Sequence, residues 1–230
     1  MRCILLAASA VLLLSCGQKP EARDYEAPNP APAAKEIPRP APPRDDRPVV
    51  LAFGDSLSAG FGLNVGESFP DYLQEIIEEK GYSYRVVNHG ISGDTTGGGL
   101  ARLSQALAVR PEIVIVELGG NDGLRGLPVA NIKANLDRII TAFKDAGAKV
   151  VLAGITLPRN YGAEYIRKFE QLYPELAKKH NIPWIRFLLQ DVATESTLML
   201  QDRIHPTAQG NRRVARQNVF PILEPLLKRQ

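Results

Sequence analysis

The chain has 230 residues, of which 44% are hydrophobic, so it is long enough for one domain with a sizeable core and short for two. Its formal net charge is only +3, and no stripe of Lys and Arg interleaved with aromatic residues accompanies it. These features argue against a nucleic-acid-binding protein, and the charge carries no further information about function.

The N-terminus has the pattern of an export signal. Arg2 supplies a positive charge, and a run of apolar and small residues continues from Cys3 to Leu14. This run is shorter than the ~20 apolar residues of a permanent membrane-spanning helix, so we expect a signal peptide over residues 1–16. Leu13-Leu14-Ser15-Cys16 resembles the bacterial lipobox, in which the cysteine is lipidated, and Gly17 would then favour the outer membrane. The alternative is an ordinary secreted protein with a chance cysteine.

Residues 17–48 have the composition of a tether. They are rich in Pro, Ala and charged side chains, and their only large apolar or aromatic side chains are Tyr25 and Ile37, so they cannot bury a core. We expect a disordered spacer without specific partners, spanning roughly 3 Å per residue where it is extended. Both cysteines of the chain, Cys3 and Cys16, precede it, so no disulfide or thiol chemistry is expected in the folded part.

From residue 49 to residue 230 the pattern predicts one α/β domain. Short apolar runs alternate with longer segments of helical periodicity, as in βαβ units with a parallel sheet. The predicted strands are Val49 to Phe53, Tyr84 to Asn88, Ile113 to Leu118, Val150 to Ala153 and Pro183 to Phe187. We therefore expect a three-layer α/β/α fold with a five-stranded parallel sheet, flavodoxin-like in strand order.

Three helices can be predicted from their apolar stripes. One begins with a capping-box-like Ser68-x-x-Asp71 and ends at Gly81. The stripes of the other two run from Ile132 to Phe143 and from Ile166 to Leu176. Apolar residues at helical spacing are usually packing residues, so we assign all three stripes to the core.

The residues that follow the strands are polar and rich in glycine. In an open parallel sheet, ligands bind beyond the carboxyl ends of the strands, so these segments should converge on one rim. They read Gly54-Asp55-Ser56-Leu57-Ser58, His89-Gly90-Ile91-Ser92-Gly93-Asp94, Gly119-Gly120-Asn121-Asp122 and Asp202-Arg203-Ile204-His205-Pro206.

These segments contain the residue types of a nucleophilic serine site. A serine needs an adjacent base, the base needs an orienting acceptor, and a developing oxyanion needs preorganised donors. Ser56 can be the nucleophile, His205 the base and Asp202 the residue that orients it. The backbone N–H groups of Ser56 and Gly93 and the side-chain amide of Asn121 can donate to the oxyanion.

The four segments resemble the SGNH, or GDSL, hydrolase superfamily. Ser56 matches in Gly-Asp-Ser-Leu, Gly93 in the second segment, Asn121 in Gly-x-Asn-Asp, and the last pair in Asp202-x-x-His205. Residues 117–126 and the Leu-Pro-x-Asn-Tyr-Gly segment further look like the bacterial periplasmic acyl-CoA thioesterase, lysophospholipase and arylesterase subfamily. The resemblance covers about residues 49–230 and implies hydrolysis of acyl esters and thioesters without a metal or an organic cofactor. The lipobox and the tether depart from those soluble periplasmic enzymes.

Several polar residues near this rim have simpler interpretations. We interpret Ser58 and Ser92 as turn-stabilising hydroxyls, His89 as a solvated or outer-shell histidine, and His180 as a solvated cation at a helix end. Asp55, Asp94, Asp122 and Asp202 with His205 could be imagined as an oxygen-rich metal site, but no metal-binding spacing is present. Asp94 and Asp122 more simply hold loops by side-chain hydrogen bonds. An ordinary α/β-hydrolase is disfavoured because Gly54-x-Ser56-x-Ser58 lacks the second glycine of its motif.

The sequence thus predicts an exported serine esterase that acts through an acyl-Ser56 intermediate. An exported enzyme does not meet cytosolic acyl-CoA, which favours lysophospholipids or other fatty acyl esters of the envelope as substrates. Two alternatives stay open: an O-acetylesterase acting on carbohydrate or peptidoglycan, and a non-catalytic surface lipoprotein that keeps the hydrolase fold.

Overall fold

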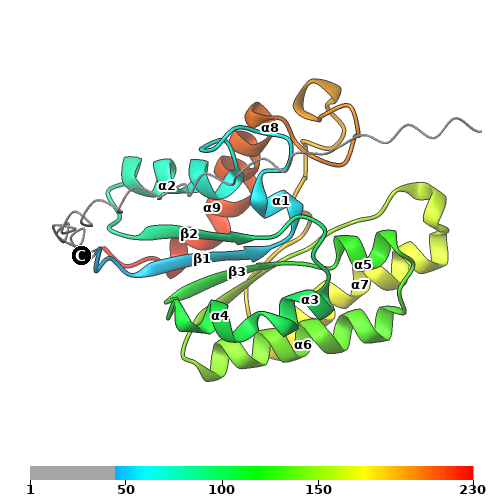
Figure 1. Ribbon diagram of the computed structural model, residues 1–230, viewed down its shortest axis with the longest axis horizontal. Helices are drawn as coiled ribbons and strands as arrows, with labels where there is room; N and C mark the ends of the chain where they lie inside the picture. The colour runs from blue at the N-terminus through cyan, green and yellow to red at the C-terminus, as the bar shows by residue number, and fades with distance from the viewer. Residues whose placement is uncertain (1–44, 230) are drawn as a thin grey trace, which may run out of the picture. The chain divides into compact units, whose positions relative to one another are not determined.

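The computed structural model describes residues 45–229, and these contain a parallel sheet of five strands in the order β2-β1-β3-β4-β5. This is the flavodoxin-like order that the sequence predicts. The strands are β1 (Val49–Gly54), β2 (Arg85–Gly90), β3 (Ile113–Glu117), β4 (Lys149–Ala153) and β5 (Trp184–Ile185). Figure 1 shows the strands running in one direction, with their carboxyl ends toward α1 (Ser56–Ala59) and α5 (Gly120–Leu124).

The fifth strand is shorter than the sequence suggests. Only Trp184 and Ile185 have ladder partners, Leu152 and Ala153 on β4. The strand lies at the edge of the sheet, where it can pair on one side only, and Pro183 has no N–H to donate. The predicted strand from Pro183 to Phe187 is therefore too long.

Helices cover both faces of the sheet (Figure 1). One face carries α2 (Phe69–Glu79) and the C-terminal segment, in which α8 (Ala208–Arg213) continues through a π-helical stretch (Val214–Val219) into α9 (Phe220–Leu223). Ser68 caps α2 through the predicted capping box with Asp71. The C-terminal helices are missing from the sequence-based prediction.

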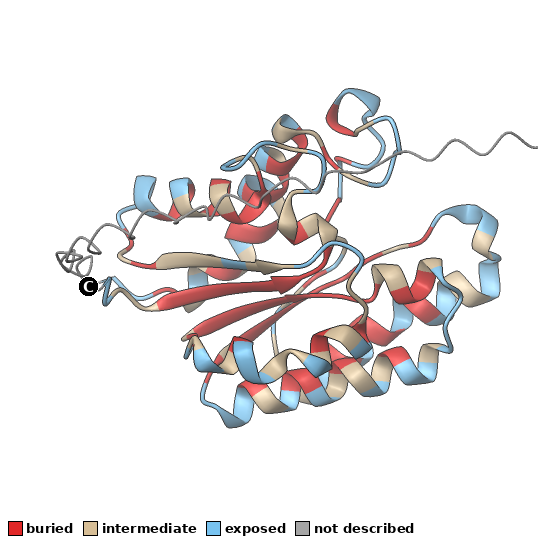
Figure 2. Ribbon diagram, in the orientation of Figure 1, coloured by how far each residue is buried: buried red, intermediate tan, exposed pale blue. Residues whose placement is uncertain are grey.

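The other face carries four helices, α3 (Thr96–Ala101), α4 (Leu103–Ala108), α6 (Val129–Asp145) and α7 (Ala163–His180). The predicted stripes of α6 and α7 bury Leu136, Phe143, Phe169 and Leu176 completely. Figure 2 shows the result: the inner strands are buried along their length, and each long helix has one buried and one exposed side.

The register of the sheet brings the candidate segments to one level. Gly54, the last residue of β1, pairs with Gly90 on β2 and with Glu117 on β3. The chain then enters α1 (Ser56–Ala59) after β1 and α5 (Gly120–Leu124) after β3. Because three strands end side by side, the residues that follow them meet at one edge.

The predicted signal peptide, Cys16 and residues 17–44 of the predicted tether lie outside the described residues. The last four residues of that tether are described, and Arg47 donates to Glu78 and to the Tyr84 carbonyl, so the predicted spacer is too long at this end. Within residues 45–229, no helix is both long enough and apolar enough to span a membrane.

Candidate active site

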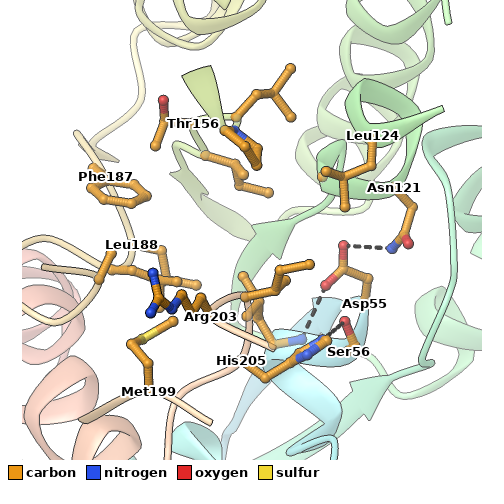
Figure 3. Close-up of a pocket in the computed structure, with 18 residues that line it drawn as sticks. Asp55, Ser56, Asn121, Leu124, Thr156, Phe187, Leu188, Met199, Arg203 and His205 are labelled. Carbon is orange, nitrogen blue, oxygen red and sulfur yellow. Dashed lines mark hydrogen bonds between the residues drawn. The ribbon is translucent and has the colours of Figure 1, made fainter. Parts of the chain in front are cut away.

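Ser56, His205 and Asp202 form one hydrogen-bonded chain, as the sequence analysis expects. The Ser56 Oγ lies 2.8 Å from the His205 Nε2, and the His205 Nδ1 lies 2.7 Å from the Asp202 Oδ2. Figure 3 shows the Ser56 hydroxyl and the His205 ring facing each other at the base of a cavity. An ionised carboxylate can only accept hydrogen bonds, so Nδ1 carries the proton toward Asp202 and Nε2 is left to accept from Ser56.

Asp202 is held in its ionised form. Its Oδ1 accepts hydrogen bonds from the backbone N–H groups of Ile204 at 2.9 Å and His205 at 3.0 Å. Burial acts to raise the pKa of Asp202, but these hydrogen bonds and the one from the His205 ring outweigh it and lower the pKa below its ordinary value. The carboxylate is therefore available to orient the imidazole at neutral pH.

The three predicted oxyanion donors differ in whether their hydrogens are already bonded. Among the described residues, the backbone N–H groups of Ser56 and Gly93 have no hydrogen-bond acceptor. Gly93 has φ +81°, in the left-handed region that favours glycine. The Asn121 amide, in contrast, already donates both hydrogens, to the Asp55 Oδ2 at 3.0 Å and to the Asp94 carbonyl at 2.9 Å.

Behind the nucleophile lie two buried carboxyl groups that the sequence analysis did not assign to the site. Glu117 is fully buried, and its Oε2 accepts from the Ser58 hydroxyl at 2.7 Å and from the N–H groups of Asp55 and Ser58 at 3.2 Å. Asp55 accepts from the Leu57 N–H and from the Asn121 amide. Glu117 thus fixes the turn that carries Ser56, and Asp55 orients Asn121.

Burial sets the protonation of this pair. It raises the pKa of Asp55 to about 6, although the hydrogen bonds from Leu57 and Asn121 oppose the change. Burial, and then the neighbouring Asp55 carboxyl, raise the pKa of Glu117 well above its usual range. The Oε1 of Glu117 has no hydrogen-bond partner among the described residues.

Arg102 ties the ends of β1 and β2 together and was also missed by the sequence analysis. Its guanidinium donates to the carbonyls of Gly54 and His89 at 2.9 Å and pairs with Asp94 at 2.7 Å. Asp94 holds its loop, as predicted, by accepting from the Thr95 N–H at 3.0 Å, and it also forms the ion pair with Arg102. Asp122 holds the neighbouring loop by accepting from the N–H and the hydroxyl of Thr96.

The cavity beside Ser56 has a volume of about 490 Å³ and a largely apolar wall. Leu124, Ile155, Leu157, Phe187 and Leu188 contribute to that wall. On the outer side of the histidine, the exposed Phe61 ring packs against the His205 ring, with their centroids 4.5 Å apart. The reacting groups therefore open into space suited to a hydrocarbon chain.

The remaining polar residues lie away from this chemistry. Ser58 is buried and donates to Glu117, while the exposed Ser92 makes no side-chain hydrogen bond among the described residues and so does not stabilise its turn as predicted. Burial and then the charge of Arg102 lower the pKa of His89. The prediction for His180 was wrong, because its ring is mostly buried and lies 2.6 Å from Asp137. Within residues 45–229, no group of three His, Cys, Asp or Glu side chains could hold a metal ion.

Comparison with models of known protein families identifies the family of this chain. The model of the GDSL-like Lipase/Acylhydrolase family matches residues 52–213, which contain Ser56, Gly93, Asn121, Asp202 and His205. The chain belongs to this family. It is a carboxylic ester hydrolase of the GDSL type, as the resemblance implied.

Named relatives cover most of the chain. Esterase TesA of Pseudomonas aeruginosa is 44% identical over 180 residues, 78% of this chain and 89% of the relative. The Escherichia coli protein named thioesterase 1/protease 1/lysophospholipase L1 is 41% identical over 159 residues, 69% of this chain and 75% of the relative. A crystal structure of TesA superimposes with a TM-score of 0.75 at 43% identity and covers 78% of this chain and 99% of that chain.

Proposed function

We propose that this GDSL hydrolase cleaves fatty acyl esters through a covalent intermediate on Ser56. The observation that carries the proposal is the Ser56–His205–Asp202 chain opening into a largely apolar cavity. The names of the relatives, an esterase and a thioesterase/lysophospholipase, support the same substrate class.

In the proposed reaction His205 moves the protons. Its Nε2 takes the hydroxyl proton as the Ser56 Oγ bonds to the carbonyl carbon, and Asp202 stabilises the resulting imidazolium. The oxyanion accepts from the N–H groups of Ser56 and Gly93, and from Asn121 once that amide releases one of its present acceptors. The carbon–oxygen bond to the leaving group then breaks, and the leaving oxygen takes the proton from His205. A water molecule repeats the sequence on the acyl-enzyme and returns free Ser56.

The cavity favours a fatty acyl group over an acetyl group. An acetyl group would leave most of the 490 Å³ empty, whereas a longer chain would bury its surface against Leu124, Ile155 and Leu157. Among esters that differ only in chain length, we therefore expect kcat/KM to rise from acetyl toward medium chains. A maximum at acetyl would favour the O-acetylesterase alternative.

The nucleophile assignment can be tested with Ser56→Ala and a fluorophosphonate probe. We expect the variant to fold normally, to lose ester turnover and to escape labelling, because the probe reacts with an activated serine. The wild-type protein should gain one phosphonyl group on Ser56 by mass spectrometry. Labelling of the wild type at another serine, or an active Ser56→Ala variant, would contradict the assignment.

We further propose that the protein is exported and anchored to the outer membrane by lipid on Cys16. The support is the lipobox-like Leu14-Ser15-Cys16 at the end of the apolar run. One acyl chain binds a membrane only marginally, whereas the several chains of a bacterial lipoprotein hold firmly. Cys16→Ser should therefore move the protein from the membrane pellet to the soluble periplasmic fraction without changing catalysis. Identical fractionation of the two proteins would refute the anchor.

A further inference from the structure

Arg203 occupies an unusual backbone position between the two residues that complete the reacting chain. It separates Asp202 from Ile204 and His205 and has φ +58°, in the left-handed region. The turn is closed by hydrogen bonds from the Arg203 N–H to the Leu200 carbonyl at 3.0 Å and from the Leu200 N–H to the His205 carbonyl at 2.8 Å. A side chain in this region costs about 1–2 kcal/mol relative to glycine. The backbone conformation at this position therefore favours glycine over arginine.

The side chain of Arg203 enters the cavity that holds Ser56. Both residues line it, and Figure 3 shows the guanidinium near Met199 and Leu188, across the cavity from Asn121. Within residues 45–229 this guanidinium makes no hydrogen bond or ion pair with another residue. Arg102 and Arg125 near the same edge, in contrast, donate to the Asp94 carboxylate and the Gly93 carbonyl.

The cavity contains no anion that could neutralise Arg203. Of its lining residues only Asp55, Arg203 and His205 can carry charge, and Asp55 is 2% exposed and already bonded to Leu57 and Asn121. A guanidinium presents five N–H donors in a fork that suits the oxygens of a phosphate or carboxylate. Arg203 is an exposed residue, so we expect salt to weaken such a contact.

The direction of the reaction indicates which part of a substrate meets Arg203. The leaving oxygen must reach the His205 Nε2 to take its proton, so the leaving group departs on the histidine side. Arg203 lies in the same turn as His205, while Asn121 marks the opposite side, where the oxyanion forms. An anion beside Arg203 therefore belongs to the leaving group.

We propose that Arg203 is a specificity-determining residue that binds a phosphate on the leaving group, as in the glycerophosphate part of a lysophospholipid. This inference rests on the proposed function, because it assumes attack by Ser56 with the acyl chain in the apolar cavity. It adds the residue that selects, among acyl esters, those whose alcohol carries a phosphate a few bonds from the ester oxygen.

Two substrates that differ only in the phosphate provide the test: 1-acylglycerol 3-phosphate and the 1-monoacylglycerol with the same short acyl chain. The measured quantity is the ratio of their kcat/KM values. For Arg203→Gln we expect this ratio to fall about tenfold, mainly through KM for the phosphate ester, which corresponds to about 1.4 kcal/mol. Arg203→Lys should keep most of the ratio, and added salt should lower it in the wild type.

Two further variants separate charge recognition from damage to the turn. Arg203→Gly suits the positive φ, so it removes the guanidinium without straining the backbone and should lower the ratio as Arg203→Gln does. The matched control is Arg138→Gln on the exposed side of α6, for which the ratio should equal that of the wild type.

An unchanged ratio in both Arg203→Gln and Arg203→Gly would overturn the inference. A p-nitrophenyl ester with the same acyl chain separates this failure from failure of the proposed function. If the wild type cleaves that ester and the ratio of kcat/KM values is unchanged in both Arg203 variants, only the inference fails. If the wild type cleaves none of the three esters, the proposed function fails.

Discussion

Replacing Glu117 by glutamine should make the free energy of unfolding less dependent on pH. Glu117 is fully buried, and its pKa in the folded protein lies well above the ordinary value of 4.5. A glutamine has nearly the same shape and keeps one oxygen to accept from Ser58 and Asp55, but it cannot release a proton. The substitution therefore removes the titration while leaving the turn before Ser56 in place.

The sign and the size of the effect follow from proton linkage. Between pH 4.5 and the raised folded pKa, the folded protein holds one more proton on Glu117 than the unfolded chain does. The stability from this group is fully present below pH 4.5 and is lost as the pH rises through the folded pKa, at up to about 1.4 kcal/mol per pH unit. Between pH 5 and the folded pKa, the wild type should therefore lose stability that Glu117→Gln keeps. Asp55, whose pKa is raised to about 6, titrates in both proteins, so below about pH 6 it makes the free energy of unfolding of each depend on pH.

Urea unfolding of both proteins at half-unit steps between pH 5 and pH 8 measures this difference. The exposed Glu195 supplies the matched control, since Glu195→Gln should leave the wild-type slope unchanged. A constant offset between the curves would reflect altered packing and does not affect the argument. Parallel curves for the wild type and Glu117→Gln would refute it, because Glu117 would then titrate alike in the folded and unfolded chains.

Three further substitutions test the site. Asn121→Ala should lower kcat by ~10²-fold with little change in KM, as for one lost oxyanion donor, and a pure KM effect would mean that Asn121 binds substrate instead. Asp202→Asn should lower kcat by about 10³-fold or more because the imidazole loses the acceptor that selects its tautomer, and a loss below tenfold would contradict that role. Gly54→Ala would place a methyl group against the Ser58 hydroxyl and the Glu117 carboxyl, so the free energy of unfolding measured in urea should fall by about 1–3 kcal/mol. An unfolding midpoint equal to that of the wild type would mean that the turn can expand to accept the methyl group.

Local patterns were sufficient to predict the sheet and much of the candidate site. The inner strands β1 and β3 are buried along their length, so their apolar runs stand out, and parallel strands require the residues that follow them to share an edge. The contact between Ser56 and His205 follows from that topology together with the motifs. The capping box at Ser68 also formed as predicted, because it depends on four consecutive residues.

The features that were missed depend on distant parts of the chain. Glu117 ends an otherwise apolar strand, and a charged residue at a buried position was the available signal. Its partners, Asp55 and Ser58, lie in the turn after β1, about 60 residues away in the sequence. Arg102 likewise reaches the end of β1 from the C-cap of α3, a helix whose glycines hide its periodicity. In the C-terminal helices Pro221 and the π-helical stretch interrupt the apolar spacing, so no single stripe marks them.

Ser56 and His205 are 149 positions apart in the sequence, so we expect the catalytic pair to form late in folding. Ser56 is carried by the first strand, but its base arrives after the fifth, on a turn followed by α8, which packs against α2. Closing a loop of this length is entropically costly, so the pair is held only after the C-terminal helices have docked. A chain that has not brought His205 to Ser56 lacks the base for ester hydrolysis, so we expect the return of ester turnover during refolding to report the formation of this contact.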